Sequence, residues 1–398
     1  MMPFPHYATK NPPGLGDINS LSRENESYRI LHKHVTLNHM EPLKNFYNAK
    51  LIQTLADTIV LYDPHFNSSA FQKSVLNTQW QTFELKQRIQ HISRSLNSFL
   101  PKDFAHAVHI LIPTARHFKG FEYIFFPDYV EQFGQEHYAL SVQALEAMTP
   151  YSSAEFAVRP LIEQHPHKMM SQLLRWTQSK DEHIRRLASE GCRPRLPWAK
   201  ALTIFKQNPD PILPVLQALK QDPSRYVRKS VANNLNDISK DHPDLVIQTA
   251  KNWLGQHKHT DWILKQGCRT LLKQAHPEAL ALFGYAEPNH IEVLNFNVPA
   301  NVKIGSYLTF FIEIQAQHAE LGKVRIEVFL HYCRANGQLS RKLFKITEGD
   351  YGKRKNIEKS IPFKPLSTRR YYPGDHWLTL VINGQPMAKK PFKLLDEL

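Results

Sequence analysis

Between Met40 and about Tyr285, apolar residues recur three or four positions apart along most of the chain. This spacing places them on one face of an α-helix, so the pattern predicts an almost wholly helical region. Prolines in the first turn mark several helix starts, as at Asp222-Pro223 and His242-Pro243. The expected helices span residues 41–61, 68–76, 79–99, 102–116, 126–135, 137–149, 152–164, 166–178, 181–189, 197–206, 210–220, 224–238, 242–255, 259–273 and 276–283.

Part of this helical pattern repeats. Val227, in the stretch Tyr226-Val-Arg-Lys-Ser-Val-Ala232, has a counterpart in Ile184, 43 positions earlier, and a weaker one in Ile263, 36 positions later. Periods of this length are typical of HEAT-type repeats, whose helix pairs stack into a curved solenoid with a concave surface. An irregular helical bundle is the alternative, because the copies are imperfect.

After Glu287 the apolar pattern changes to a period of two, which indicates half-buried β-strands. The pair Asn383-Gly384 between two alternating runs predicts a hairpin. About seven strands within such a length indicate an immunoglobulin-like β-sandwich. The expected strands span residues 292–298, 306–314, 323–332, 342–347, 355–362, 368–372, 376–382 and 385–394.

The two patterns divide the chain into three parts. Residues 1–39 have no apolar periodicity and several Pro and Gly residues, so we expect a disordered N-terminal extension. Residues 40–287 are the expected all-α HEAT-like solenoid, and residues 288–398 the expected all-β sandwich. No apolar run approaches the length of a membrane span, and the N-terminus has no secretory signal pattern, so we expect a cytoplasmic, nucleoid-associated protein and no membrane partner.

The net charge of the 398-residue chain is +14, which favours a polyanionic partner such as DNA. Residues 288–398 hold 17 Lys and Arg against 10 Asp and Glu. Basic residues gather at Lys353, Arg354 and Lys355 in this part, so we expect it to contact DNA there, although lysines at a sheet edge also serve solubility. The three cysteines are far apart, and we expect no metal and no cofactor.

The segment Glu190–Ala199 interrupts the helical pattern. Arg193 and Arg195 flank Pro194, so no helix runs through them, and Trp198 follows. Guanidinium groups match phosphates, and an indole face suits a cation or a sugar, although a tryptophan at such a place also serves to fill a gap between helices.

Two further stretches carry candidate chemistry. Glu155 and Arg159 lie four positions apart within the expected helix 152–164, so we expect them on one helix face, where a surface salt bridge is the simplest interpretation. Asp237 ends a helix that also contains Asn233 and Asn234, which are poor choices for a helix interior. A C-terminal helix end explains these residues without a function.

The stretches 153–160, 186–199 and 226–243 together resemble the AlkC branch of the HEAT-like DNA alkylation-repair glycosylases. The resemblance covers most of residues 40–285, and the expected sandwich resembles the immunoglobulin-like domain of some AlkC proteins. It implies excision of N3-methylated bases from duplex DNA, chiefly 3-methyladenine with 3-methylcytosine as a second candidate, and without base flipping. It further implies catalytic roles for Glu155, Trp198 and Asp237, and DNA contacts by Arg159, Arg193, Arg195 and Arg228.

The implied reaction suits these residue types. A base methylated at N3 is cationic and already a good leaving group, so the enzyme needs negative charge near the oxocarbenium-like sugar more than a general acid. We expect a monofunctional, monomeric glycosylase whose partner is double-stranded DNA with alkylated bases. Two alternatives remain open at this point: a catalytically inactive DNA-binding HEAT protein, and a HEAT protein-interaction scaffold.

Overall fold

The computed structural model describes residues 42–334, 338–364 and 370–396. The predicted N-terminal extension, residues 1–39, lies outside this part of the chain. Among the described residues, no helix is both long enough and apolar enough to cross a membrane.

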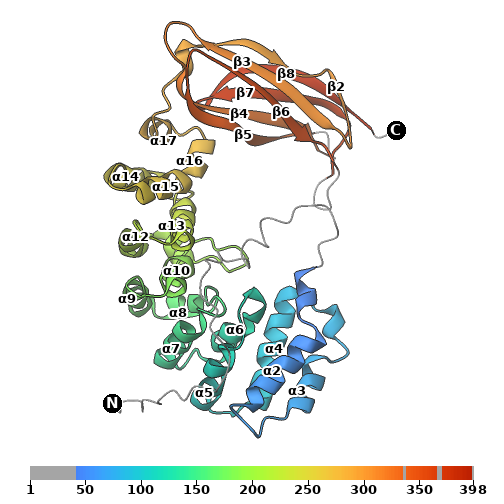
Figure 1. The fold of residues 1–398 in the computed structure, drawn as a ribbon, viewed down its shortest axis with the longest axis vertical. Helices are drawn as coiled ribbons and strands as arrows, with labels where there is room; N and C mark the ends of the chain where they lie inside the picture. Colours follow the sequence, from blue (N-terminus) through green and yellow to red (C-terminus); the bar gives the residue numbers. More distant parts are fainter. Residues whose placement is uncertain (1–41, 335–337, 365–369, 397–398) are drawn as a thin grey trace, which may run out of the picture.

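The chain is helical up to Leu282, as the apolar periodicity predicts, and Figure 1 shows these helices stacked in a curved row. Side chains cap several helix starts: Asn48, Asp103, Asp181 and Ser224 each accept a hydrogen bond from a backbone N–H of the first turn. The α-helices are α2 (Ala49–Val60), α3 (Ser68–Val75), α4 (Leu85–Phe99), α5 (Phe104–Ala115), α6 (Phe125–Phe133), α7 (Tyr138–Met148), α8 (Val158–Gln164), α9 (Pro166–Trp176), α10 (Glu182–Gly191), α11 (Thr203–Gln207), α12 (Leu213–Leu219), α13 (Arg225–Ile238), α14 (Pro243–Trp253), α15 (Lys258–Gly267), α16 (Arg269–Lys273) and α17 (Pro277–Leu282). Short 3₁₀ turns span Leu43–Phe46 (η1), Trp80–Thr82 (η2), Phe121–Tyr123 (η3), Asp210–Ile212 (η4) and Pro288–His290 (η5).

The repeat seen in the sequence is a structural repeat. Helices α10, α13 and α15 carry Ile184, Val227 and Ile263, and they pack side by side in that order. Polar contacts tie the copies together: Arg185 of α10 binds Asp222, which precedes α13, at 2.6 Å. The Ser189 hydroxyl donates to that of Ser230 at 2.6 Å between α10 and α13. HEAT-like stacking is therefore confirmed, in place of an irregular bundle.

Two helix predictions near the candidate site are wrong. Helix α8 begins at Val158, so Glu155 lies in the turn before it and does not share a helix face with Arg159. No helix begins at residue 197; the next one, α11, starts at Thr203, and Trp198 lies in a turn. Both misplaced starts lie in segments whose polar side chains bond to distant parts of the chain, which no local pattern records.

The remaining residues form an immunoglobulin-like sandwich of two sheets. One sheet has the strand order β1-β3-β6, and the other has the order β2-β8-β7-β4-β5. Asn383, with φ of 44°, and Gly384 form the turn of the predicted hairpin between β7 and β8. Residues 370–372 of the strand expected at 368–372 are not in a strand, and 368–369 lie outside the described residues. The strands are β1 (Ile291–Asn297), β2 (Asn301–Lys303), β3 (Tyr307–Ala316), β4 (Gly322–Cys333), β5 (Leu339–Tyr351), β6 (Arg354–Pro362), β7 (Gly374–Ile382) and β8 (Gln385–Leu395).

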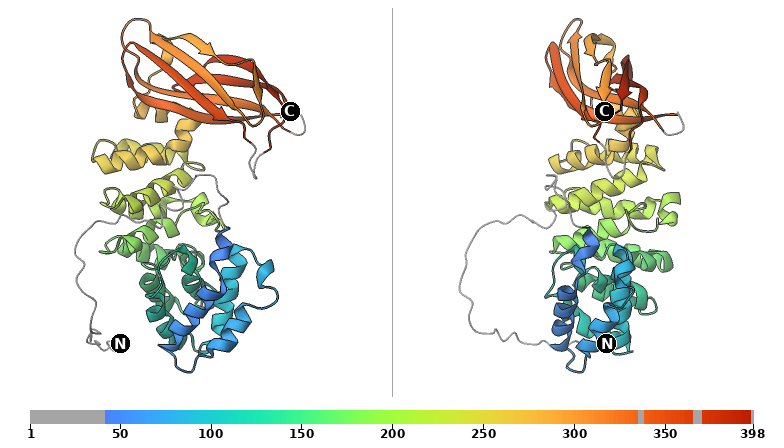
Figure 2. Two further views of the ribbon diagram at one scale, coloured as in Figure 1. Left: turned by 45° about the vertical axis from the view of Figure 1, so that its right-hand side comes forward. Right: turned by 90° about the vertical axis from the view of Figure 1, so that its right-hand side faces the viewer.

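A polar junction fixes the sandwich to the last helices. Glu348 of β5 binds Lys265 of α15 at 3.1 Å and accepts a hydrogen bond from the Tyr285 hydroxyl at 3.2 Å. The Asn383 amide donates to the Ala286 carbonyl at 2.7 Å. The two views of Figure 2 show the sandwich seated at one end of the helical stack, as these contacts require. The sandwich is thereby held in one orientation relative to the helices.

Candidate DNA-lesion site

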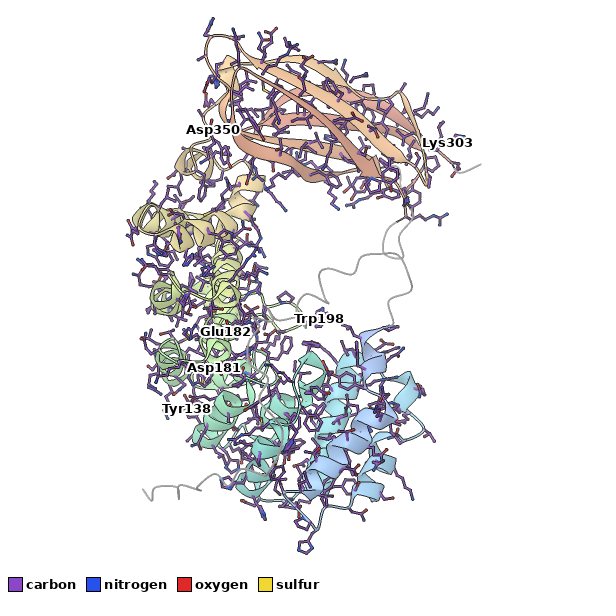
Figure 3. All side chains as sticks on the ribbon, in the orientation of Figure 1. Tyr138, Asp181, Glu182, Trp198, Lys303 and Asp350 are labelled. Atoms are coloured by element: carbon purple, nitrogen blue, oxygen red, sulfur yellow. The ribbon has the colours of Figure 1, made fainter. Side chains whose placement is uncertain are left out.

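The segment between α10 and α11, residues 192–202 and here called the connector, presents Trp198 to solvent. The Trp198 side chain is 56% exposed, and its φ of 66° lies in the left-handed region that a bulky residue rarely adopts. Lys86 of α4 donates to its backbone carbonyl, and the Phe121 ring meets the indole edge-on at 5.9 Å between centroids. Figure 3 shows Trp198 at the inner side of the curved stack. An exposed indole in a strained backbone conformation is typical of a functional site.

Arg159 holds the connector in place. Its guanidinium is buried and donates to the Gly191 carbonyl at 3.0 Å, the Arg193 carbonyl at 2.9 Å and the Lys200 carbonyl at 2.7 Å. One side chain therefore satisfies backbone acceptors at both ends of the connector. We expected Arg159 at a DNA-facing surface, but the structure places its guanidinium inside the protein, where burial lowers its pKa.

A chain of ion pairs runs beneath the connector. Arg186 of α10 pairs with Glu155 and, at 3.3 Å, with Glu190. Arg193 then pairs with Glu190 at 2.6 Å and with Asp237 of α13 at 2.9 Å. The Ser153 hydroxyl also donates to Glu155 at 2.8 Å, and Lys240 binds Asp237 at 3.1 Å. The two carboxylates predicted from the sequence, Glu155 and Asp237, thus belong to one network.

The arginines of the network keep Glu190 charged despite its burial. Burial alone disfavours the charged form of Glu190, but Arg186 and Arg193 offset this, and the pKa of Glu190 lies below its ordinary value. Burial likewise disfavours the charged form of Arg193, but Glu190 and Asp237 raise its pKa. The three carboxylates and their partners Arg186, Arg193 and Lys240 thus lie in a geometry fixed by direct ion pairs.

The other predicted arginines lie in different surroundings. Arg193 is buried within the network and is not at the surface as expected. Arg195 lies at the surface in a bidentate pair with Asp241, at 2.6 and 3.0 Å. Arg228 donates to the backbone carbonyls of Asp222 and Pro223 at the start of α13. Among these side chains, that of Arg195 is the most accessible to a phosphate.

Sequence reasoning missed Arg186 and Glu190 as members of the network. Part of a signal was present: Arg186 lies on the expected helix 181–189, beside the buried Leu187 and Ala188. Glu190 follows four positions after Arg186, just past the expected end of that helix. Charged residues on the buried side of an amphipathic helix are rarely there without partners. Among the described residues, no three His, Cys, Asp or Glu side chains group as a metal site.

The sandwich presents a second surface, on the outer face of β4, β5, β7 and β8. Near the helices this face carries Arg325 and Glu348 of the junction. Farther along β4 it carries Phe329 and His331, which pair across the sheet with Thr379 and Trp377. Arg341 lies 5.0 Å from the centre of the Phe329 ring, and Lys389 lies 5.4 Å from that of Trp377. We call the set Phe329, His331, Arg341, Trp377 and Lys389 the outer face.

The outer face lies beyond the helices. Phe329 is four residues past Arg325, or about 13 Å along the strand, so it is clear of the junction. Figure 1 shows the sandwich projecting from the helical stack toward the side on which the connector lies.

The predicted cluster at Lys353, Arg354 and Lys355 has a different position. It follows the turn between β5 and β6, close to Asp350, which Figure 3 places at the end of the sandwich beside α17. Arg354 pairs with Glu313, and Lys355 lies 4.7 Å from the centre of the Tyr351 ring. Lys353 is exposed.

Comparison with known proteins is consistent with this architecture. Residues 140–271 match the family described as DNA alkylation repair enzyme. Residues 292–396 match the C-terminal Ig-like domain of the uncharacterised protein YhaZ. The first match contains the connector and the buried network, and the second contains the outer face.

Two relatives are similar over nearly the whole chain. The uncharacterized protein YhaZ of Bacillus subtilis is 47% identical over 360 residues, which is 89% of this chain and 100% of YhaZ. The alkylpurine DNA glycosylase AlkC of Pseudomonas fluorescens, solved bound to DNA containing an abasic site analog, is 31% identical with a TM-score of 0.85. That match covers 89% of this chain and all of AlkC. These similarities and the fold define a HEAT-like DNA alkylation repair protein with an immunoglobulin-like domain. Within this class, the chain belongs to the AlkC family.

Proposed function

We propose that this protein is an alkylpurine DNA glycosylase that hydrolyses the N-glycosidic bond of cationic N3-methylated bases in duplex DNA. The proposed substrate is chiefly 3-methyladenine, with 3-methylcytosine second. The observation that carries the proposal is the buried ion-pair network, which gathers Glu155, Glu190 and Asp237 beneath the connector that presents Trp198.

The chemistry follows from charge. As the bond to a cationic base lengthens, positive charge moves from the base to C1′ and the ring oxygen of the sugar. Fixed carboxylates stabilise this charge without reorganising, and one of them orients the attacking water. The exposed indole of Trp198 offers an apolar, electron-rich face to the sugar. The base departs neutral, so no general acid is required and the base need not leave the stack before cleavage.

The arginines divide between positioning and DNA contact. Arg193 and Arg186 hold the carboxylates in place, and Arg159 holds the connector, so we assign these three positioning roles. Arg195 remains the candidate phosphate contact beside Trp198. Arg228 is a weaker candidate, because its guanidinium is engaged by two carbonyls.

The sandwich is the proposed second half of a DNA clamp. A curved helical stack grips a duplex from one side only. The sandwich projects to the side of the connector, and its outer face supplies cations and aromatic rings. In this clamp, Arg341 and Lys389 contact the DNA. Lys353, Arg354 and Lys355 are less suitable, because they lie at the end of the sandwich nearest the helices.

The direct test is release of free 3-methyladenine from methylated duplex DNA by wild type, Glu155→Gln and Asp237→Asn. Each substitution removes one charge at nearly constant shape, so excision should fall by about 10²-fold or more while affinity for undamaged duplex changes little. Glu136→Gln, at an exposed position, is the matched control. Near-normal turnover by both site variants would show that the active site is misplaced.

Base release and duplex affinity together also test the two alternative functions, an inactive DNA-binding protein and a protein-interaction scaffold. Salt-sensitive DNA binding without base release by the wild type identifies an inactive DNA-binding protein. No affinity for duplex DNA identifies a protein-interaction scaffold.

A further inference from the structure

A cavity of about 230 Å³ lies next to the candidate site, between α4, α6, α8 and the connector. Three aromatic side chains contribute to its lining: Phe121, Phe156 and Trp198. Ser153, which also lines it, donates a hydrogen bond to the Glu155 carboxylate at 2.8 Å. The cavity therefore adjoins the ion-pair network and shares Trp198 with the proposed active site.

Two carboxyl groups of α6, Asp128 and Glu131, line the cavity one helical turn apart. Asp128 accepts a hydrogen bond from Gln132 at 2.6 Å. The Glu131 carboxyl has no hydrogen bond or ion pair with any residue that the structure describes. A half-buried carboxyl without a partner is unfavourable for folding, and such groups are typical of ligand sites.

The surroundings keep Glu131 about half protonated near neutral pH. Burial, helped by the charge of Asp128, raises the pKa of Glu131 to about 7, while Lys86 and Arg159 oppose the rise. The other charged groups that line the cavity are Glu163 of α8 and Lys200 of the connector, which pair with each other at 3.5 Å. Glu131 thus offers carboxyl oxygens without a partner in the described part of the chain and, as the pH falls below about 7, a proton to donate.

We propose that this cavity receives the free purine base after excision, with the amine edge of an adenine-type ring paired to the Glu131 carboxyl. The inference rests on the proposed glycosylase function, because that reaction supplies the base. The volume is below the ~300 Å³ at which pockets for drug-sized ligands begin, so it suits a ligand the size of a single ring system.

Adenine matches these groups in both shape and hydrogen bonding. A protonated carboxyl offers one O–H donor and one carbonyl acceptor side by side. Adenine and 3-methyladenine offer the complement, an N6 amine that donates and the ring atom N7 that accepts. The aromatic walls supply faces on which a flat ring can stack. Unsubstituted purine lacks the amine, so it makes one hydrogen bond fewer at this edge and fits the carboxyl less well.

The test is calorimetric titration of the full chain, without DNA, with adenine, 3-methyladenine and unsubstituted purine. Wild type and Glu131→Gln should bind both adenines, because an amide also offers a donor and an acceptor. Glu131→Leu should bind them about tenfold or more weakly, because it leaves the base edge without hydrogen bonds. Unsubstituted purine, which lacks the N6 amine, should bind more weakly than adenine. Glu136→Gln, outside the cavity, should behave as wild type.

A pH series adds a readout that a structural role would not give. Wild-type affinity for adenine should fall as the pH rises through about 7, when Glu131 loses its proton, whereas the affinity of Glu131→Gln should stay constant across this range. An equal pH dependence in both proteins overturns the proposed pairing. If Glu131→Leu does not fold, Phe156→Leu tests the cavity through loss of an aromatic wall.

Failure of this proposal and failure of the glycosylase function are distinguishable. A protein that releases methylated bases but binds no free adenine or 3-methyladenine overturns the cavity proposal alone, as does unchanged binding by Glu131→Leu. If the protein binds the free bases but does not release them from DNA, the cavity proposal stands and the proposed glycosylase function is wrong.

Discussion

The helical region and the sandwich use their positive charges in opposite ways. Around the candidate site, Arg159, Arg186 and Arg193 are buried and donate to carbonyls and carboxylates of the same chain. On the sandwich, Arg341 and Lys389 are exposed and lie beside aromatic rings. Arg325 is the exception: it is buried in the polar junction that joins the two regions.

The difference shows that a basic protein need not bind DNA with its most prominent arginines. A buried guanidinium whose partners are already satisfied contributes position, while an exposed one contributes attraction for phosphates. If this division holds, substitutions in the helical region should mainly alter stability or turnover, and substitutions on the sandwich should mainly alter binding.

The largest effect is expected for Arg193→Ala. It leaves two buried carboxylates, Glu190 and Asp237, without their shared cation, which costs about 3–5 kcal/mol of unfolding free energy. Chemical denaturation measures this loss. Arg195→Ala, which removes a surface partner of Asp241, is the control and should cost under about 1 kcal/mol. If the Arg193→Ala protein has normal stability but binds DNA more weakly, Arg193 contacts a phosphate, as the sequence predicted.

Arg159→Ala should be next. It removes the guanidinium that donates hydrogen bonds to three backbone carbonyls and so fixes the connector. The buried carbonyls left unpaired should lower the free energy of unfolding by about 1–3 kcal/mol. The connector should then open more often, so amide hydrogen exchange should accelerate over residues 192–202 and excision should fall. Arg159→Lys should rescue little, because one ammonium does not reproduce the planar fork. Unchanged exchange in the connector would contradict the positioning role.

Glu131→Gln should raise stability in a pH-dependent way. The pKa of Glu131 is about 7 in the folded protein against an ordinary 4.5, so between these values the folded state holds a proton that the unfolded state has lost. Wild-type stability therefore falls as the pH rises through this window, whereas this contribution is absent in the variant. The free energies of unfolding of wild type and variant, obtained from melting curves, should coincide near pH 4.5. Above pH 7 they should differ by on the order of 2 kcal/mol. A constant difference at every pH would rule out the titration of Glu131 as the cause.

The smallest effect on stability, and a clear one on binding, is expected for the double variant Arg341→Ala with Lys389→Ala. Loss of two phosphate contacts should flatten the plot of log affinity against log salt by about 0.9 per contact. Melting temperature should not change, since both side chains are exposed. The triple variant at Lys353, Arg354 and Lys355 is the matched comparison, and a larger effect there than at the outer face would restore the sequence-based assignment.

The sequence predicted the candidate site unevenly. Glu155, Asp237 and Trp198 were predicted from stretches that carry the family resemblance, and their catalytic roles stay predictions. The structure places both carboxylates in one ion-pair network and exposes Trp198 on the connector. Arg186 and Glu190 were missed, because the expected helix ended at residue 189, whereas α10 runs to Gly191 and carries both residues. The helix expected across residues 152–164 was wrong at its start, because Glu155 forms an ion pair with α10 in place of joining the first turn of α8.

By itself, the sequence determined the type and order of the elements. Apolar residues recur with a period near four up to about Tyr285 and with a period of two after Glu287. These periods determine which segments are helices and which are strands, because each period places the apolar side chains on one face of only one type of element. The repeat around Val227 likewise determined how the helices stack. Only the tertiary structure decided which arginines are buried and where the sandwich joins the helices. Those outcomes depend on partners far apart in the chain, such as Arg193 with Asp237 and Lys265 with Glu348, and no local pattern records a contact over that separation.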